Sequence, residues 1–511
     1  MSAAGAIILI GFMGAGKTTA ARELAASRGL HVSDVDQQIE TRGVGTIAEI
    51  FERDGEPAFR ALEEQVVCEL LANSREGEVI SLGGGAVGSE RIRAALAEHL
   101  VVWLDVEPTL AWRRVGAGAR PLARDRAAFD ERYETRLPIY AALADAIIPS
   151  TARAAMPRAY EAVEQLRHAP AGTRLVWAVS GSAEYPVWIG RGVLGSGLWP
   201  IARPPSRRFC VTDEHVGPLW LERAGGLDGE IVIAAGERSK SLDGAHQVWR
   251  GLARAGMTRA DHLVALGGGV VGDLAGFCAA TYQRGVPVVQ VPTTLAAQVD
   301  SAYGGKTGVD LPEGKNYVGV YHQPAGVLVD PATLATLPAA ELSAGYAEVI
   351  KTALIAGGTL WQRIAADRPI DDDVIFDCAR CKLGIVGEDE RDEGPRQVLN
   401  LGHTVAHAIE TVTDYRRYRH GEAVGLGLLA ALELSGADDL RAQVRELLEA
   451  HGLPTRAEGL DPAAVIEATR RDKKRVGASV PFVLIDAPGA VRHGAEVTRE
   501  QLEAAVMELC R

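Results

Sequence analysis

A glycine-rich loop close to the start of the chain has the residue types and spacing of a phosphate-binding loop. Residues 11–18 read GFMGAGKT and lie between an apolar segment, typical of a buried strand, and a helical pattern. In such a loop the backbone N–H groups contact phosphates, the lysine reaches the terminal phosphates and the next hydroxyl ligates Mg²⁺. Lys17 and Thr18 occupy these positions, so the sequence predicts a nucleotide site here.

Charged residues in the same part of the chain could hold the molecule that receives the phosphate. Asp34 and Asp36, in VSDVDQQIE, end the expected second strand on the same edge as the loop, and their alternating spacing points one carboxylate toward the metal and the other away from it. Asp105, at the end of another expected strand, competes for the metal role. The remaining candidates are cations and a close-approach glycine turn, namely Arg60, Gly83, Gly84, Gly85, Arg120 and Arg136.

A second glycine pattern lies farther along the chain. Residues 267–272 read GGGVVG and satisfy GxGxxG between an expected strand and an expected helix, which is typical of dinucleotide sites but also of plain strand–helix packing. Asp213, at the end of another strand, could accept a ribose hydroxyl, and Glu237 and Lys240 lie near a further strand end. These residues favour a dinucleotide site.

Histidines gather in the last third of the sequence. His403 and His407 are one helical turn apart and share a face, His420 follows, and Glu348 lies upstream in AEVIK. Two imidazoles and a carboxylate with an open fourth position are typical of catalytic Zn²⁺, whereas structural histidines with satisfied hydrogen bonds are the alternative.

Lysine is rare in this chain, in which nearly all cationic side chains are arginine. A retained lysine therefore marks a place where a compact, titratable ammonium is needed. The lysines are Lys17, Lys240, Lys306, Lys315, Lys351, Lys382, Lys473 and Lys474.

Composition restricts the classes of partner and the location. A formal net charge of -13 argues against nonspecific nucleic-acid binding, and no apolar run approaches a membrane span. The N-terminus lacks a basic start, and the 6 cysteines are scattered, so we expect reduced thiols in the cytoplasm. Cys378 and Cys381 form an isolated CxxC in a helical pattern, which indicates buried thiols rather than a metal site.

The elements that must position these residues divide the chain into two parts. Short apolar segments alternate with helical patterns over residues 1–167, which predicts a parallel sheet with helices on both faces. Residues 168–173 (HAPAGT) are the candidate linker. Strands and helices alternate again over 174–336, and residues 337–511 are mainly helical apart from one late strand, VPFVLID.

Taken together, the motifs of residues 1–167 resemble shikimate kinase. The segments GFMGAGKTT, the DxD, TIAEIFERDGEPAFRALE, SLGGGAV, ARPL and RLPIY occur in that family's order and spacing. The resemblance implies an α/β P-loop kinase that uses ATP and Mg²⁺ to phosphorylate the 3-hydroxyl of shikimate. It implies that Asp36, Arg60, Arg136 and the turn 83–85 hold shikimate, that Asp34 serves the reacting hydroxyl and the Mg²⁺ shell, and that Arg120 lies on a lid over ATP. The implied nucleotide loop comprises Gly14, Ala15, Gly16, Lys17, Thr18 and Thr19, with Lys17 also catalytic.

The segment from about residue 175 onward resembles 3-dehydroquinate synthase throughout. The longest match runs over residues 266–324, and ELSAGYAEVIK, RQVLNLGHTVAHAIE, HGEAV and DKKRVG follow it. Tyr303 departs from the small aliphatic residue expected before GGKTG. The resemblance implies a two-lobed unit, with an α/β NAD-binding lobe and a mainly α-helical metal-binding lobe. Its reaction converts 3-deoxy-D-arabino-heptulosonate 7-phosphate to 3-dehydroquinate and phosphate, and NAD⁺ is reduced and reoxidised within one turnover.

The same resemblance assigns residues to each ligand. It implies Zn²⁺ on Glu348, His403 and His420, with His407 beside the metal as a proton carrier. The implied NAD⁺ residues are Asp213, Glu237, Lys240, Gly269, Val270, Val271, Gly272, Asp273, Thr293, Thr294, Lys306, Lys315, Thr333 and Thr336. The implied substrate residues are Arg284, Lys306, Asn316, Lys351, Lys382, Arg396, Asn400 and Lys474, of which Lys306, Lys351 and Lys382 are also catalytic. In this family the arginine matching Arg284 comes from a partner subunit, which implies a homodimer through the synthase half.

Other functions fit parts of the pattern. The C-terminal half could be an NAD-dependent polyol dehydrogenase, but the dense cluster of Lys and Arg argues for a phosphate-bearing substrate. It could also cyclise a different sugar phosphate, although the set Lys382, Arg396, Asn400 and His407 and the adjoining kinase favour the dehydroquinate reaction. A half that serves only as a scaffold is disfavoured because both halves keep their charged residues.

Overall fold

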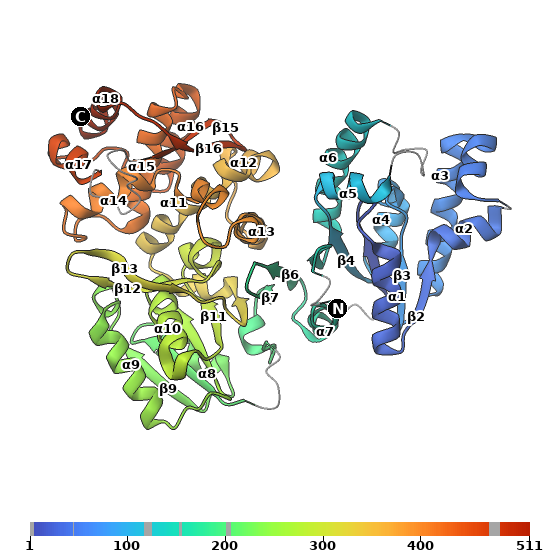
Figure 1. The fold of residues 1–511 in the computed structure, drawn as a ribbon, viewed down its shortest axis with the longest axis horizontal. Helices are drawn as coiled ribbons and strands as arrows, with labels where there is room; N and C mark the ends of the chain where they lie inside the picture. The colour runs from blue at the N-terminus through green and yellow to red at the C-terminus, as the bar shows by residue number, and fades with distance from the viewer. Residues whose placement is uncertain (1–4, 44, 117–124, 153–155, 201–205, 470–480) are drawn as a thin grey trace. The chain divides into compact units, whose positions relative to one another are not determined.

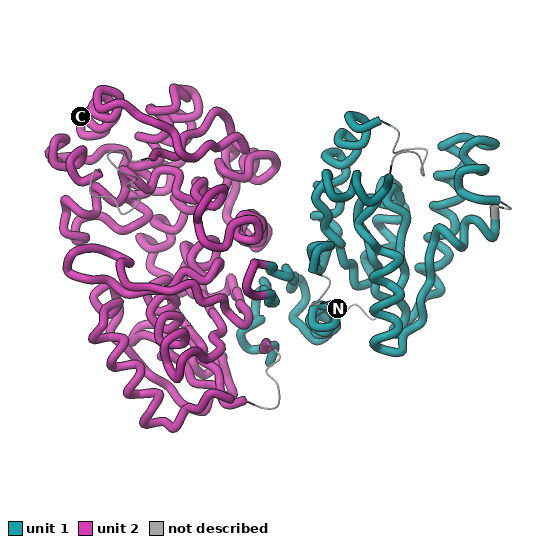
Figure 2. The backbone as a smooth tube through the Cα atoms, in the orientation of Figure 1, with its two compact units in different colours: residues 1–179, 184–198 teal, residues 180–183, 199–511 magenta. Residues whose placement is uncertain are grey.

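The computed structural model describes residues 5–43, 45–116, 125–152, 156–200, 206–469 and 481–511. The chain forms two compact units (Figure 2). Unit 1 comprises Met1–Val179 and Glu184–Leu198, and unit 2 comprises Ser180–Ala183 and Trp199–Arg511. The placement of a linker at 168–173 stays a prediction.

The sheet of unit 1 confirms the parallel arrangement predicted from the sequence. Its strands have the spatial order β2-β3-β1-β4-β5-β6-β7, and only β7 runs antiparallel to its neighbour β6. Strands β1 and β4 are apolar and almost wholly buried, as expected of central strands covered on both faces. The strands are β1 (Ile7–Ile10), β2 (His31–Asp34), β3 (Glu78–Ser81), β4 (Leu100–Asp105), β5 (Ala146–Pro149), β6 (Arg174–Val179) and β7 (Glu184–Ile189).

The helices of unit 1 include the one that follows the glycine loop. Helix α1 begins at Lys17, directly after Gly16, whose positive φ of 90° allows the chain to turn from the loop into the helix. The helices are α1 (Lys17–Arg28), α2 (Val35–Gly43), α3 (Ile47–Asn73), α4 (Glu90–Leu96), α5 (Pro108–Val115), α6 (Arg126–Leu143) and α7 (Met156–Gln165).

The main-sheet strands of unit 2 are parallel and have the order β14-β11-β10-β8-β9. An antiparallel hairpin, β12–β13, lies between this sheet and the helices α11 and α14 (Figure 1). The strands are β8 (Arg208–Asp213), β9 (Gly229–Ile233), β10 (His262–Gly267), β11 (Val288–Pro292), β12 (Lys306–Leu311), β13 (Gly314–Tyr321), β14 (Gly326–Val329), β15 (Phe482–Ala487) and β16 (Ala490–Ala495). The interpretation of one late strand was incomplete, because β15 pairs with β16, whose mostly exposed residues AVRHGA carry no apolar run.

The last part of unit 2 is mainly helical, as predicted. The sheet lobe carries α8 (Gly217–Ala224), α9 (Leu242–Arg254) and α10 (Gly269–Thr281). The helical lobe contains α11 (Ala339–Ala356), α12 (Gly358–Ala365), α13 (Asp372–Glu388), α14 (His403–Val412), α15 (His420–Leu434), α16 (Asp438–Ala450), α17 (Pro462–Thr469) and α18 (Arg499–Cys510).

Helices α11 and α15 form the buried centre of the helical lobe and approach each other closely. Residues 344–355 of α11 are buried, and so are Gly421 and residues 423–432 of α15. A Cβ on Gly421 would overlap the carbonyl of Ala344, so only glycine permits this approach. The contact places His420, at the start of α15, next to the helix that carries Glu348.

Two further findings bear on the expectations from composition. Among the described residues, no helix is both long enough and apolar enough to cross a membrane. All of the cysteines are free thiols, and Cys378 and Cys381 lie on α13 as expected.

Candidate functional site

The glycine loop of unit 1 holds its lysine in a defined position. The Lys17 ammonium donates hydrogen bonds to the carbonyls of Gly11, at 2.8 Å, and Phe12, at 3.2 Å. Gly14 has a φ of 82°, a left-handed conformation that an L side chain rarely adopts. The strand, loop and helix therefore have the order expected of a phosphate-binding loop. Ala15 and Gly16 belong to the loop, and Thr18 and Thr19 belong to the first turn of α1.

Asp34, at the end of β2, lies beside Thr18 of α1. The Thr18 hydroxyl donates a hydrogen bond of 2.7 Å to Asp34 Oδ2, and Asp34 Oδ1 accepts one of 3.0 Å from the backbone N–H of Asp36. Asp36 belongs to the first turn of α2 rather than to the strand. The argument from strand alternation was therefore wrong for Asp36. Asp105 ends β4, as expected.

The residues expected to hold the phosphate acceptor converge around the turn 83–85. A Cβ on Gly83 would approach Asp36 Oδ1 at 3.4 Å, and one on Gly85 would overlap the guanidinium of Arg60. The Arg136 guanidinium donates a hydrogen bond of 3.2 Å to the carbonyl of Gly84. Glycine at positions 83 and 85 therefore lets the side chains of Asp36 and Arg60 approach the backbone of the turn. Arg120 lies outside the described residues.

Glu63 belongs to this cluster but was not identified from the sequence. It is 2% exposed and forms an ion pair of 2.5 Å with Arg60, three residues earlier on α3. Burial raises the pKa of Glu63, although Arg60 opposes the shift. The spacing of three residues between Arg60 and Glu63 is a weak signal in the sequence, because many exposed helices carry oppositely charged residues at this spacing.

The GxGxxG segment of unit 2 connects β10 to α10, which confirms the strand–glycine–helix order expected there. Helix α10 begins at Gly269. Within it, Asp273 forms an ion pair of 2.6 Å with the buried Lys240. The backbone N–H of Thr293 donates to the carbonyl of Gly267, while its buried hydroxyl has no hydrogen-bond partner among the described residues. That hydroxyl provides an unsatisfied polar group that fits a dinucleotide.

Other residues assigned to the dinucleotide are distributed as follows. Asp213 ends β8 and accepts backbone N–H groups of the next turn, and Val271 is buried in the sheet core, next to Val270 and Gly272 on α10. Thr294 Oγ1 accepts the N–H of Ala297. The hydroxyls of Thr333 and Thr336 are both used in internal hydrogen bonds.

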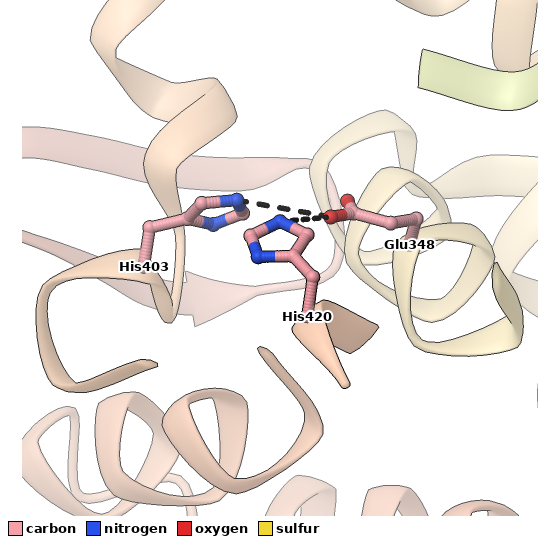
Figure 3. A group of neighbouring side chains, drawn as sticks. All are labelled: Glu348, His403 and His420. Carbon is pink, nitrogen blue, oxygen red and sulfur yellow. Dashed lines mark ion pairs between the residues drawn. The ribbon is translucent and has the colours of Figure 1, made fainter. Parts of the chain in front are cut away.

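Glu348, His403 and His420 form a compact group of potential metal ligands (Figure 3). One ligand atom from each lies within 4.8 Å of the others. The distance to Glu348 Oε1 is 3.7 Å from His403 Nε2 and 3.3 Å from His420 Nε2. The His407 ring centroid lies 5.5 Å from that of His403, beside this group rather than within it.

The second nitrogen of each imidazole faces a hydrogen-bond acceptor. His403 Nδ1 lies 3.2 Å from the carbonyl of Leu401, and His420 Nδ1 lies 3.4 Å from both carboxylate oxygens of Glu410. An N–H at Nδ1 leaves the lone pair of Nε2 directed at the metal position, as in most metal-binding histidines. Burial raises the pKa of Glu348, but Lys351 and the histidines bring it well below its usual range, so a carboxylate is available. The donor set therefore fits zinc.

A cluster of cations lies next to the metal ligands. Asp300, in the π-helical turn η8 (Ala297–Ser301), pairs with Lys351 at 3.1 Å and with Lys382 at 2.7 Å. Lys351 also pairs with Glu348 at 2.6 Å, and Arg396, which is 1% exposed, donates to the carbonyl of Gly304 at 3.0 Å. The structure therefore brings the predicted Lys351, Lys382 and Arg396 into one region, and it adds Asp300, which sequence reasoning missed.

The other described residues expected to contact the substrate lie on short 3-10 helical turns and on the hairpin. Lys306 pairs with Asp392, and Asn400 donates to the carbonyl of Gln397 at 3.1 Å. Asn316 and Arg284 have φ values of 56° and 70°, which are strained conformations for residues other than glycine. Lys473 and Lys474 lie outside the described residues.

Comparison with known proteins identifies both halves. Residues 13–167 match the family model of shikimate kinase, and residues 230–344 and 345–475 match the N-terminal and C-terminal models of 3-dehydroquinate synthase. The 3-dehydroquinate synthase of Halorhodospira halophila is 42% identical over 352 residues, which cover 66% of this chain and 99% of that protein. The chain belongs to the 3-dehydroquinate synthase family.

Further relatives agree with this assignment. The 3-dehydroquinate synthase of Symbiobacterium thermophilum is 44% identical over 337 residues, covering 61% of this chain and 94% of that protein. A solved structure of 2-epi-5-epi-valiolone synthase from Streptomyces hygroscopicus subsp. jinggangensis, with NAD⁺ and Zn²⁺ bound, is similar at 26% identity. Its TM-score is 0.59, and the match covers 65% of this chain and 99% of that one. This chain therefore joins a shikimate kinase domain to a 3-dehydroquinate synthase domain and is a bifunctional enzyme of the shikimate pathway.

Proposed function

We propose that unit 1 transfers the γ-phosphate of ATP to the 3-hydroxyl of shikimate at the site formed by the glycine loop and the turn 83–85. Asp36 accepts hydrogen bonds from the ring hydroxyls, and Arg60 and Arg136 pair with the carboxylate of shikimate. Lys17 neutralises charge on the transferred phosphoryl group, which is the main requirement of this reaction. The closeness of Asp36, Arg60 and Arg136 to one glycine turn supports this proposal.

Magnesium belongs to the same proposal. The hydrogen-bonded pair Thr18–Asp34 offers the oxygen ligands that Mg²⁺ prefers, next to the phosphate loop. When bound, Mg²⁺ would neutralise the phosphates of ATP. Asp34 also lies where it can orient the reacting hydroxyl.

We propose that unit 2 converts 3-deoxy-D-arabino-heptulosonate 7-phosphate to 3-dehydroquinate with NAD⁺ and Zn²⁺. The observation that carries this proposal is the group Glu348, His403 and His420 beside the buried cations Lys351 and Lys382. Glu348, His403 and His420 would hold zinc, which would supply a Lewis acid for the reacting hydroxyl, and bound NAD⁺ would supply a hydride acceptor.

The side chains of unit 2 have separate roles in that reaction. Lys351, Lys382 and Arg396 bind the anionic groups of the substrate. The two ammoniums share Asp300, and Glu348, the other partner of Lys351, would be engaged by zinc, which leaves an excess of positive charge. His407 carries a proton at its imidazole beside the metal ligands. Lys306, Asn316 and Asn400 complete the substrate contacts.

The dinucleotide is proposed to lie along the start of α10. Gly269, Gly272 and Asp273 line its approach, and the unsatisfied Thr293 hydroxyl donates to it. Glu237, Lys240 and Lys315 lie on the same side as Asp273, joined by ion pairs. The NAD⁺ and Zn²⁺ bound to the related valiolone synthase support this choice of cofactors.

A homodimer is part of the proposal. Arg284 is exposed, and both it and Gln283 have positive φ values, 70° and 49°. Its guanidinium has no ion pair with another described residue, which suits a residue that completes the site of a partner subunit. We further propose a cytoplasmic enzyme without nucleic-acid or membrane partners. Its halves are residues 1–167 and 174–511, with the synthase lobes meeting near residue 336.

The test is an assay of the purified chain with heptulosonate phosphate that follows phosphate release and net NADH. The proposal expects phosphate release without accumulation of NADH, whereas a polyol dehydrogenase would accumulate NADH in proportion to product. A strong chelator followed by excess Mg²⁺ should remove cyclisation and leave phosphorylation of shikimate. If zinc does not restore cyclisation, the assignment of Glu348, His403 and His420 is wrong.

A further inference from the structure

The partner of His420 on the side away from the metal ligands is Glu410. His420 Nε2 faces Glu348, whereas its Nδ1 lies 3.4 Å from both oxygens of Glu410. Glu410 lies on α14 seven residues after His403, which places the two on the same helical face. Its side chain is 2% exposed, so its carboxylate depends on protein partners for stabilisation.

The second partner of Glu410 comes from the hairpin that also contacts the dinucleotide residues. Lys315 Nζ lies 3.1 Å from Glu410 Oε1 and 3.4 Å from Glu237 Oε1, and 4.7 Å from the centre of the Tyr415 ring. Lys315 belongs to β13, Glu237 precedes α9, and Glu410 belongs to the helical lobe. A continuous series of charged contacts therefore runs from Glu237 through Lys315 and Glu410 to a metal ligand.

We propose that Glu410 is a positioning residue for His420, and that Lys315 couples the metal site to the dinucleotide site through Glu410. The proposal rests on the proposed function, since it takes zinc and NAD⁺ as the ligands. Each ligand fixes one end of the series, zinc through His420 and NAD⁺ through Glu237. The second ligand then binds to groups that are already ordered, so each strengthens the binding of the other.

The measurement is the zinc affinity of the full-length apoprotein, by competition with a chromophoric chelator, with and without saturating NAD⁺. In the wild type, NAD⁺ should tighten zinc binding at least about fivefold. Glu410→Gln should weaken zinc binding about 10- to 100-fold, the usual effect of losing a partner of a metal-binding histidine. The spectrum of bound Co²⁺ should change in the same variant, because the orientation of the His420 ring changes.

Two further variants separate the parts of the proposal. At an NAD⁺ concentration shown to saturate the variant, Lys315→Met should abolish the effect of NAD⁺ on zinc affinity, while zinc affinity without NAD⁺ stays within about threefold of the wild type. Glu410→Asp keeps the charge but withdraws it from His420, so it should shift the Co²⁺ spectrum and weaken zinc binding even if the glutamine variant does not fold. The control is Glu341→Gln, which removes a carboxylate 2.8 Å from Arg419, next to His420 in sequence, without contact to the ring.

The outcomes are distinct. Zinc affinity and Co²⁺ spectra that match the wild type in the Glu410 variants would overturn the positioning role. An undiminished effect of NAD⁺ on zinc affinity in Lys315→Met would overturn the coupling. A loss of zinc affinity in Glu341→Gln equal to that in Glu410→Gln would overturn the positioning role. Wild-type protein that binds neither zinc nor NAD⁺ would instead overturn the proposed function, and this inference with it.

Discussion

Replacing Lys382 by methionine should stabilise unit 2 while abolishing its activity. Lys382 is 7% exposed and shares its partner Asp300 with Lys351, which also pairs with Glu348. Burial lowers the pKa of Lys382, and Lys351 lowers it further, so that it falls from 10.5 to about 8 in spite of Asp300. This shift corresponds to about 3 kcal/mol of unfavourable free energy for the charged form at pH 7. Removing the charge should therefore stabilise the folded state by that amount. The variant also loses the hydrogen bond from Lys382 to the carbonyl of Asp300, which offsets about 1 kcal/mol of this stabilisation.

The sign of the pH dependence follows from the direction of the shift. Between pH 8 and 10.5 the unfolded chain binds more protons at this lysine than the folded chain does, so the stability of the wild type rises with pH there. Below pH 8 Lys382 is charged in both states, so its burial lowers the free energy of unfolding by the full amount. In Lys382→Met the rise should be absent, and the variant should be more stable than the wild type by about 2 kcal/mol at pH 7.

The assay is hydrogen exchange of α13 peptides in the full-length protein across a urea series, because it reports unit 2 separately from unit 1. Lys240→Met is the matched control. Lys240 is 5% exposed, and burial lowers its pKa, but Asp273 and Glu237 outweigh burial and raise it above its usual value. That variant should lose about 3 kcal/mol, measured on α10, because Asp273 loses its partner. If Lys382→Met is no more stable than the wild type, the charge imbalance inferred at Asp300 is wrong.

Three other perturbations test the rest of the description. Lys17→Ala should abolish phosphorylation of shikimate and leave dehydroquinate formation near that of the wild type, and comparable loss of both in folded protein would contradict separate domains. Burial raises the pKa of Asp261, but hydrogen bonds from Arg207 and Thr258 outweigh it and lower the pKa from 3.8 to about 2. This carboxylate should therefore contribute about 2 kcal/mol to the free energy of unfolding above pH 4, and the contribution should disappear as the pH falls to 2. In an acid titration of stability, Asp261→Asn should not show this decrease. Genetic division of the chain within 168–173 should change kcat and KM of each half by less than about threefold, since the synthase product must be dehydrated and reduced before the kinase can use it. A larger drop would show that the halves support each other's sites.

The parallel strands and the glycine loops were predictable because their signals are local. Every residue of β10 (HLVALG) is buried, and a continuous apolar segment of this length before a glycine turn and a helix is typical of a central parallel strand. Strand β16 had no such signal, because it is held by pairing with β15 rather than by apolar side chains. Asp36 was misplaced for a related reason, since the chain turns into α2 directly after Asp34.

The site was predictable in its ligands but not in the carboxylates that balance them. The histidines at 403 and 407 show their common face in the sequence, because helical spacing is local. Asp300 pairs with Lys351, 51 residues later in the chain, and Glu410 pairs with Lys315, 95 residues earlier. No pattern along the sequence connects pairs that are so far apart. The fold alone brings these charges together.

Charge balance at the buried lysines separates groups that hold the fold from groups that await a ligand. Lys240 is surrounded by Asp273 and Glu237, so its positive charge is more than matched inside the protein. Lys382 and Lys351 share Asp300, although Lys351 also pairs with Glu348, a carboxylate that metal binding would engage. An excess of buried positive charge destabilises every folded molecule that has no ligand bound. Such an excess is therefore typical of a functional site. An anion that supplies the missing charge should therefore stabilise this unit. Inorganic phosphate should accordingly slow hydrogen exchange of α13 in the wild type and have little effect in Lys382→Met.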